Sequence, residues 1–322
     1  MAKKKILITG SCGFIYSNFI RRIIFNKHPY EIVSIDKLTN SKLKNNIYFN
    51  KNHQFYLGDI CDTHLIDKIF EFERPDIVLH TAAESAVDYS LQNPNAFINS
   101  NVLGTQIVIN ASIKYGVKKF IYQSTDEVYG ALTSEKDMPW TESSSINPRN
   151  PYSASKAAGE MLVNAAHNAH GLQYIILRTS NNYGPRQMPD KLIPRVIKCI
   201  LNNEKIPVYG QGSQIRDWTY VGDNCDAVLK IIESDRINEV FNISSNQEYS
   251  NIEVVNEICN VIGKGHDLIT FIKDPRGNAH DFRYSVDSKK TRLLGWKPEV
   301  KFKETGLKDT VDWYIANSYW FN

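Results

Sequence analysis

The chain carries, near its start, the segment KILITGSCGFIY (residues 5–16), which decides the fold. Residues 5–9 form a short apolar run of the kind that is buried in parallel sheets, and a helix is predicted from Phe14 onward. Gly10 allows the tight turn between them, and Gly13 lets the backbone approach a pyrophosphate at the helix N-terminus. We therefore expect a dinucleotide-binding β-α unit, with Phe14 and Ile15 in the cofactor site.

Strands and helices alternate along the first half of the chain. Alternation of this kind is typical of βαβ units, and it predicts an α/β fold with a doubly wound parallel sheet, the Rossmann arrangement. We expect strands at 5–9, 31–36, 54–57, 77–80, 120–123 and 174–177, and helices at 14–25, 65–73, 95–115 and 153–170.

The pattern changes after about Arg178, where turns become frequent and the elements become shorter. We expect a Rossmann domain over residues 1–177 and a smaller, interleaved C-terminal domain over residues 178–322 that covers the substrate. The segment 240–244 is predicted to be a strand that returns to the first sheet.

The composition is that of an ordinary globular protein: 42% of the residues are hydrophobic and 23% are charged. A formal net charge of +3 gives no reason to expect nucleic acid or a membrane as a partner. The five cysteines are scattered and include no Cys-x-x-Cys, so neither a disulfide framework nor a metal site is predicted. No apolar run has the length of a membrane span. We expect a cytoplasmic protein.

Further candidate contacts with a dinucleotide follow the other strands. Asp36 closes the second strand, where a carboxylate can accept both ribose hydroxyls. Because it would also repel a 2′-phosphate, NAD is favoured over NADP. Asp59 and Ile60 follow the third strand, and Ala82 and Ala83 follow the fourth, so all four lie at the carboxyl ends that form the ligand crevice of such a sheet.

Tyr16 departs from the dinucleotide-binding pattern. It stands where a third small residue usually permits close packing of the helix on the strand. A phenol at this position must tilt the helix or point away from the sheet.

Two short motifs carry the candidate chemistry, Thr125-Asp126-Glu127 and Tyr152-Ser153-Ala154-Ser155-Lys156. The tyrosine and the lysine are four residues apart and therefore share one helix face. An ammonium beside a phenol favours the phenolate, which can take a proton from an alcohol near neutral pH. The two adjacent carboxyls add a separate acid and base. A simple alcohol dehydrogenase has no need of this pair, whereas a dehydrogenase that also removes water does.

With these motifs the chain resembles the extended short-chain dehydrogenase/reductases. Within them it is similar to the nucleoside-diphosphate-glucose (NDP-glucose) 4,6-dehydratases, which are best known for acting on dTDP-glucose. Thr-Asp-Glu distinguishes this class, since related 4-epimerases and decarboxylases carry other residues there. The resemblance covers nearly the whole chain and is carried by residues 10–15, 82–85, 124–130, 152–156, 178–187 and 215–218.

The resemblance implies a lyase that uses NAD internally and regenerates it. Tyr152, helped by Lys156, takes the C4 hydroxyl proton while a hydride passes from C4 to NAD, and Thr125 holds that hydroxyl. Glu127 then removes the C5 proton, and protonated Asp126 donates to the departing C6 hydroxyl. The hydride returns to C6, so the product is an NDP-4-keto-6-deoxyglucose.

The resemblance also implies contacts with a nucleotide-sugar substrate. Glu84 and Ser85 are expected to meet the glucose hydroxyls, and Asn181 and Arg216 the diphosphate, for which a guanidinium fork is well suited. The remaining candidates line the base and ribose pocket or add polar contacts: Lys191, Pro207, Tyr209, Asn251 and Arg276.

Three departures from the family pattern concern the substrate. Ala86 stands where family members commonly have a histidine, Tyr89 stands where they have an arginine, and residues 274–281 are a rearranged version of a shorter loop. dTDP and UDP differ by one methyl group and one hydroxyl, and a methyl contact is worth only ~1 kcal/mol. The nucleotide therefore stays open between the two.

Two alternative functions also stay open. One is an NDP-sugar 4-epimerase or decarboxylase on the same scaffold, in which the two carboxyls would be idle. The other is a non-catalytic NAD-binding relative. In relatives, the helices that correspond to residues 95–115 and 153–170 pair across a two-fold axis, so a homodimer is expected.

Overall fold

The structure is a computed structural model that describes residues 3–39, 41–277 and 280–321. Asn278 and Ala279, which belong to the rearranged loop, lie outside the described residues. The chain forms two compact units. Unit 1 comprises Met1–Tyr129, Ser145–Arg178 and Glu233–Phe241; unit 2 comprises Gly130–Ser144, Thr179–Ile232 and Asn242–Asn322.

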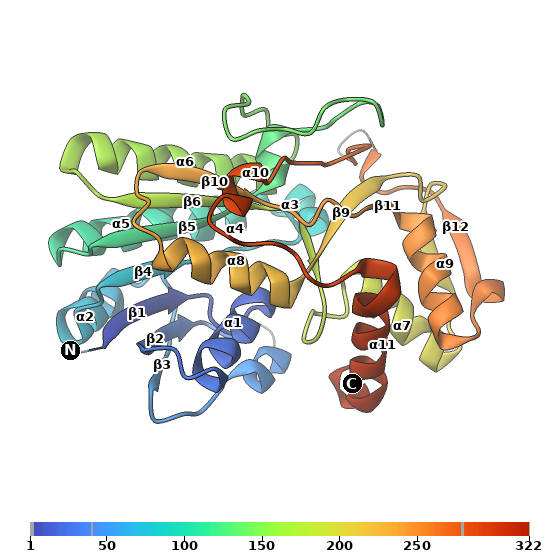
Figure 1. Ribbon diagram of the computed structural model, residues 1–322, viewed down its shortest axis with the longest axis horizontal. Coiled ribbons are helices and arrows are strands. Elements are labelled where there is room, and N and C mark those ends of the chain that lie inside the picture. Colours follow the sequence, from blue (N-terminus) through green and yellow to red (C-terminus); the bar gives the residue numbers. More distant parts are fainter. Residues whose placement is uncertain (1–2, 40, 278–279, 322) are drawn as a thin grey trace. The chain divides into compact units, whose positions relative to one another are not determined.

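A seven-stranded sheet in the order β10-β6-β5-β4-β1-β2-β3 is the centre of unit 1 (Figure 1). Strand β3 pairs with β2, β2 with β1, β1 with β4 and β4 with β5, and all four pairs are parallel, as the sequence predicts. The segment expected to return to this sheet forms its edge strand β10. The strands are β1 (Lys4–Thr9), β2 (Tyr30–Asp36), β3 (His53–Leu57), β4 (Ile77–His80), β5 (Lys119–Thr125), β6 (Tyr174–Thr179) and β10 (Glu239–Ile243).

Both faces of the sheet are buried, which confirms the doubly wound arrangement. On one face, Leu7, Val78 and Phe120 pack against the contiguous helices α2, α5 and α6. Successive strand residues point to opposite faces, and the intervening Ile8 and Ile121 are fully buried too. The helices of unit 1 are α1 (Phe14–Phe25), α2 (Thr63–Glu73), α3 (Val87–Gln92), α4 (Pro94–Phe97), α5 (Thr105–Lys114) and α6 (Pro151–His170).

The single helix expected over residues 95–115 is wrong in its middle part. The structure has a π-helix, η2 (Ile98–Gly104), between α4 and α5. A Cβ at Gly104 would lie 2.5 Å from Ile60 Cδ1, so glycine allows this segment to approach the strand end before α2. π-Bulges often occur at functional sites, and this one carries Asn101, whose side chain is fully buried.

Helix α6 is defined at both ends by its sequence. Asn150 and Ser153 form a capping box, Pro151 opens the helix, and Gly171 ends it in the left-handed conformation with φ 72°. In the middle of the helix, a Cβ on Gly159 would overlap the Tyr122 ring of β5. The missing side chain therefore lets α6 lie directly against the catalytic strand.

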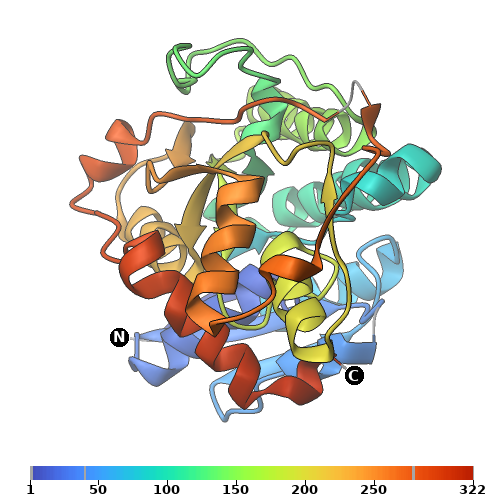
Figure 2. The ribbon, with the colours of Figure 1, turned by 90° about the vertical axis from the view of Figure 1, so that its right-hand side faces the viewer.

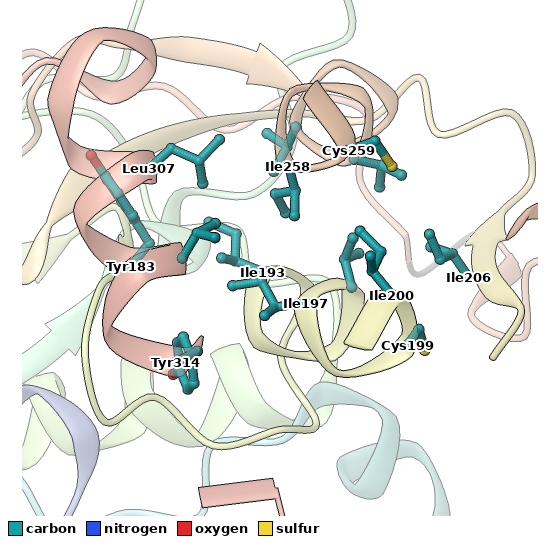
Figure 3. Close-up of a cluster of buried hydrophobic side chains, with 14 of the residues drawn as sticks. Tyr183, Ile193, Ile197, Cys199, Ile200, Ile206, Ile258, Cys259, Leu307 and Tyr314 are labelled. Atoms are coloured by element: carbon teal, nitrogen blue, oxygen red, sulfur yellow. The ribbon is translucent and has the colours of Figure 1, made fainter. Parts of the chain in front are cut away.

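Unit 2 contains a three-stranded sheet, β11-β9-β7, and a two-stranded sheet, β12-β8. In Figure 2, α9 (orange) lies between α7 (yellow) and α11 (red), and the three helices contact one another. Ile193, Ile197 and Ile200 of α7 point toward Ile258 of α9 in a buried apolar cluster (Figure 3). The elements are β7 (Asn181–Tyr183), α7 (Leu192–Asn202), β8 (Ile206–Tyr209), β9 (Ile215–Tyr220), α8 (Val221–Glu233), β11 (Glu248–Ser250), α9 (Asn251–Ile262), β12 (Ile269–Ile272), α10 (Lys289–Arg292) and α11 (Leu307–Ala316).

The described residues include no helix that is both long enough and apolar enough to traverse a bilayer.

Candidate active site

The glycine turn between β1 and α1 forms one end of the site. Gly10 has φ +69°, and a Cβ there would lie 2.6 Å from Ala82 Cα, so only glycine lets the two strand ends approach. Gly13 is the N-cap of α1, and a Cβ there would have only Gly10 O, at 3.1 Å, as a neighbour. The space before the helix, where Phe14 and Ile15 begin the first turn, can therefore receive an anion.

Asp36 is fixed beside this turn. Its Oδ2 accepts from Cys12 N at 2.9 Å and its Oδ1 accepts from Leu38 N at 2.8 Å. Burial raises the pKa of the Asp36 carboxyl, and the two N–H groups oppose that effect. Next to it, Lys37 Nζ lies 3.6 Å from Asp59 and 3.3 Å from Glu84. A glycine turn, a helix N-terminus and a carboxylate at the second strand form a donor set that fits NAD.

The end of β4 is held by a buried histidine that the sequence analysis did not identify. Thr105 Oγ1 donates to Asn101 O at 2.6 Å, so the proton of the His80 ring lies on Nε2, 2.9 Å from Thr105 Oγ1. His80 Nδ1 then accepts from Thr9 Oγ1 at 2.8 Å, and Thr9 Oγ1 accepts from Ala82 N at 3.1 Å. Burial lowers the pKa of His80 to about 3, so the ring is a neutral link between strand ends.

Other predicted cofactor residues lie near the same edge. Ile60 is buried and packs into the apolar core against Gly104, so its side chain supports the strand end. Asp59 Oδ1 accepts from Cys61 N at 2.9 Å, which fixes the turn after β3. Ala83 is half-buried between Ala82 and Glu84.

The Thr-Asp-Glu motif begins at the end of β5 and continues into a short 3-10 helix, η3 (Asp126–Tyr129). Thr125 Oγ1 donates to Asp126 Oδ1 at 3.2 Å and accepts from Glu127 N at 3.3 Å. Glu127 Oε2 accepts from Asn150 Nδ2 at 3.1 Å. Since Asn150 also caps α6, the Glu127 carboxylate is tied to the start of the helix that carries Tyr152.

Tyr152 is a close neighbour of this motif. Burial raises the pKa of its phenol well above the usual range, and the charges of Glu127 and Asp126 raise it further, whereas a hydrogen bond with Thr125 lowers it. The phenol, the Thr125 hydroxyl and both carboxyl groups are therefore near enough to act on one another. The structure thus brings together Tyr152 and all three residues of the motif.

Lys156 lies one turn further along α6. Its side chain is 3% exposed, and its Nζ lies 4.3 Å from the centroid of the Tyr122 ring. Burial lowers the pKa of Lys156 to about 7, although the Glu160 carboxylate opposes this. Burial and the two carboxylates dominate the Tyr152 pKa in this structure, and the effect of the Lys156 ammonium on the phenol stays a prediction.

A buried ion pair behind Lys156 was missed by the sequence analysis. Glu160 Oε1 accepts from Ser124 Oγ at 2.5 Å, and its Oε2 accepts from Arg178 Nη2 at 2.6 Å. The Arg178 guanidinium also lies 4.6 Å from the centroid of the Tyr129 ring. A carboxylate four residues after Lys156 and eight after Tyr152 is on their helix face, so the spacing was a usable signal.

Asn101 of the π-helix is a second missed residue. Its Nδ2 donates to Glu84 O at 2.9 Å and to Ser155 Oγ at 2.8 Å, and its Oδ1 accepts from Glu84 N at 2.8 Å. The backbone of Glu84 is thereby fixed against α6, while its carboxylate pairs with Lys37. Ser85, the other predicted glucose contact, is exposed.

The two single-residue departures from the family pattern lie on or beside α3. Ala86 directly precedes this helix, and Tyr89 lies within it. The Tyr89 ring is 5.9 Å from Phe97, and Phe97 is 6.3 Å from Tyr152, measured between ring centroids. Tyr89 is therefore connected to Tyr152 through one buried ring.

In unit 2, part of the predicted substrate set gathers around His280, which the sequence analysis did not select. The centroid of the Tyr209 ring lies 6.3 Å from that of His280 and 5.8 Å from the Arg276 guanidinium. Burial lowers the pKa of His280, and so do the charges of Arg216 and Arg276. Arg216 is buried and donates to Asp281 O at 2.9 Å.

The other predicted substrate residues are spread over unit 2. Asn181 begins β7, Lys191 precedes α7, Pro207 lies in β8, and Asn251 begins α9. Lys191 Nζ lies 3.3 Å from Asp190 Oδ2.

Comparison with known proteins identifies close relatives. The model of the family described as GDP-mannose 4,6 dehydratase matches residues 7–310. The low-salt glycan biosynthesis protein Agl12 of Haloferax volcanii is 42% identical, over 97% of this chain and 99% of its own length. A dTDP-glucose 4,6-dehydratase of Salmonella typhimurium is 41% identical, over 99% of this chain and 94% of its own length. The resemblance noted from the motifs is confirmed.

Solved structures give the same result. A dTDP-glucose 4,6-dehydratase (DesIV) from Streptomyces venezuelae, with NAD and TYD bound, superimposes with a TM-score of 0.91 at 35% identity and covers 98% of both chains. A UDP-glucose 4-epimerase from Thermotoga maritima, with UDP-glucose, reaches a TM-score of 0.89 at 32% identity, covering 98% of this chain and 99% of its own. Dehydratases and epimerases therefore share this scaffold.

Replacing Lys156 by Met is expected to stabilise the cofactor-free protein at low pH. The folded-state pKa of Lys156, about 7, is below the 10.5 that is usual for a solvated lysine. The free-energy cost of burying the ammonium is therefore complete below pH 7 and disappears as the pH rises toward 10.5. The gain in unfolding free energy should be roughly 2–5 kcal/mol at pH 6. Denaturant titrations at pH 6 and pH 9 measure it; an equal effect at both pH values would contradict the assignment.

Proposed function

The chain belongs to the GDP-mannose 4,6-dehydratase family, and on that premise we propose that it removes water from an NDP-glucose and uses NAD as its cofactor. The observation that supports this function best is the convergence of Tyr152 with two carboxyls, Asp126 and Glu127, at the end of β5. Oxidation at C4 needs one base, whereas elimination across C5 and C6 needs another base and an acid. The site has all three groups.

NAD, when bound, supplies an acceptor for the C4 hydride and then returns that hydride to C6. We assign its pyrophosphate to the Gly10–Gly13 turn and the start of α1, and its adenosine ribose to Asp36. Asp36 already accepts two backbone N–H groups, which hold its carboxylate ready for ribose hydroxyls. Its negative charge disfavours a 2′-phosphate.

In the first half-reaction, Tyr152 removes the C4 hydroxyl proton as the C4 hydride leaves. Because burial and the carboxylates raise the pKa of this phenol, the phenolate that accepts the proton has to be favoured by nearby positive charge. A cationic nicotinamide ring and the Lys156 ammonium would both favour the phenolate that must accept it. Thr125, which bonds to this phenol, positions the C4 hydroxyl.

In the second half-reaction, Glu127 takes the C5 proton that the 4-ketone has made acidic. Asp126 gives a proton to the C6 hydroxyl, which departs as water. Glu127, after exchanging its proton with solvent, protonates C5 as the hydride reaches C6, and exchange with solvent also restores Asp126 and Tyr152. Substrate and product thus differ by one water, and no external oxidant is needed.

Mass measurement with labelled substrate tests this reaction. We expect 4-deuterated dTDP-glucose or UDP-glucose to lose one water and to retain the deuterium at C6, and solvent deuterium to enter C5. An unchanged mass would indicate an epimerase, and loss of carbon dioxide from the matching uronic acid would indicate a decarboxylase. Comparison of the two nucleotides also decides which one the enzyme prefers.

Glu127→Gln is expected to separate the two half-reactions. The amide keeps the shape of the side chain and its bond to Asn150 but cannot accept a proton, so C5 deprotonation should slow by about 10²–10⁴-fold. Reduced cofactor would then accumulate, and its nicotinamide absorbance measures this directly. Tyr152→Phe is the matched control, because it blocks the earlier step and should show no reduced cofactor. Normal turnover by Glu127→Gln would remove Glu127 as the base.

We assign the nucleotide and diphosphate to unit 2. Arg216 and Arg276 place two cations next to His280, and Tyr209 offers a ring face beside them. Such a group suits a diphosphate and a base. Asn181, Lys191, Pro207 and Asn251 complete the proposed contacts.

A homodimer fits the apolar surface of unit 1. Ile98, Leu103 and Met161 expose 52%, 52% and 50% of their area, respectively, on η2 and α6, which contact each other. A second copy of this surface would cover them. We propose that dimerisation uses these two elements.

Leu103→Glu is expected to produce a monomer, because it places a charge in the proposed dimer contact. Leu293→Glu is the control, since Leu293 is 84% exposed and follows α10 in unit 2. Sedimentation velocity should show a shift to lower mass for Leu103→Glu alone. A wild-type monomer at working concentration would contradict the proposal.

A reducing cytoplasm suits the thiols. All five cysteines are free, and burial raises the pKa of Cys12, which lies in the cofactor turn, to about 12. A thiol in this state is a poor nucleophile and a poor partner for oxidation. We therefore propose that the enzyme works in that compartment.

A further inference from the structure

Tyr16 is buried, although the dinucleotide-binding pattern calls for a small residue at its position. It is the third residue of α1, and 4% of its area is exposed. Its ring packs edge-on against Phe19 of the same helix, with centroids 5.9 Å apart. A phenol that is buried in this way needs a partner for its hydroxyl.

The partner is Gln123 on β5. The Tyr16 hydroxyl donates to Gln123 Oε1, and Gln123 Nε2 donates to Ser124 O at 2.6 Å. Gln123 is 8% exposed, so this is a polar side chain inside a sheet strand. Tyr122 belongs to the core that packs on α2, α5 and α6. Gln123 therefore points to the opposite face of the sheet, where it meets α1.

The last residues of β5 before the catalytic motif are thus held from both faces. Tyr122 lies under Lys156 Nζ, Ser124 Oγ bonds to Glu160, and Gln123 bonds to Tyr16. The first two contacts come from α6. The third comes from the first turn of α1, directly behind the turn assigned to the cofactor pyrophosphate.

We propose that Tyr16 and Gln123 form a positioning pair, which fixes the start of α1 relative to Thr125, Asp126 and Glu127. The pair sets where the cofactor is held with respect to the residues that act on the sugar. Hydride transfer depends steeply on this separation, since a displacement of about 1 Å can cost about 10²-fold in rate. The inference rests on the proposed function for its kinetic part only.

The test is a double-mutant cycle with Tyr16→Phe, Gln123→Leu and the combined variant. Either single change breaks the same bond, so each should raise the dissociation constant of NAD several-fold and lower kcat roughly 10-fold, with little change in the KM of the sugar. The combined variant should be no worse than the poorer single variant. Tyr16→Phe keeps the ring and its packing, so the fold is retained.

Tyr56→Phe is the matched control. Tyr56 of β3 donates to Glu73 of α2 at 2.6 Å and so also joins a strand to a helix of unit 1. The Tyr56→Phe substitution should lower the unfolding temperature without changing NAD affinity or kcat. If Tyr16→Phe behaves in the same way, or if the two single effects multiply in the combined variant, the inference is overturned. The dissociation constant of NAD and the unfolding temperature can both be measured without turnover. These two measurements therefore test the inference even if no nucleotide sugar reacts.

Discussion

The buried carboxylate of Glu160 is the interaction on which the catalytic architecture depends. It joins three elements, because it is part of α6 and accepts hydrogen bonds from Ser124 of β5 and Arg178 of β6. Removing one partner of a buried ion pair typically costs about 3–5 kcal/mol, since it leaves an uncompensated charge. Here the same carboxylate also acts on the Lys156 ammonium one turn away. The helix that presents Tyr152 is thus held to the sheet by charge as well as by packing.

The fold could be predicted from local sequence, and the candidate catalytic motif could be located there. Local sequence was sufficient where a structural feature depends on residues that are close together in the chain. This holds for the glycine turn, for Asp36 at the end of its strand, and for the Thr-Asp-Glu and Tyr-x-x-x-Lys motifs. His80 and Asn101 could not be ranked in that way, because their partners Thr9 and Glu84 lie at least 17 residues away in the chain. For Glu160 the helix spacing was a usable signal, but its ion pair with Arg178, 18 residues away, was not. The π-helix could not be predicted, because its sequence has no simple hydrophobic periodicity. The raised pKa of Tyr152 could not be predicted either, because it depends on burial, which only the folded chain defines.

The comparison with a 4-epimerase at a TM-score of 0.89 shows how little of this scaffold specifies the reaction. The shared machinery oxidises a sugar alcohol beside a nicotinamide. The resemblance implies that the difference lies in whether an acid and a second base stand at the end of β5. Function on such a fold has to be argued from the side chains of the site, because the fold serves several chemistries.

Asn150 has two roles that are seldom combined. Its Oδ1 accepts from Ser153 N and so starts α6, while its Nδ2 donates to Glu127. Helix ends are the parts of a protein that open most readily. A brief fraying of this first turn would release the glutamate and displace Tyr152 while the seven strands stayed paired. Loss of this cap would therefore disturb the glutamate and the tyrosine together, because one amide side chain holds both.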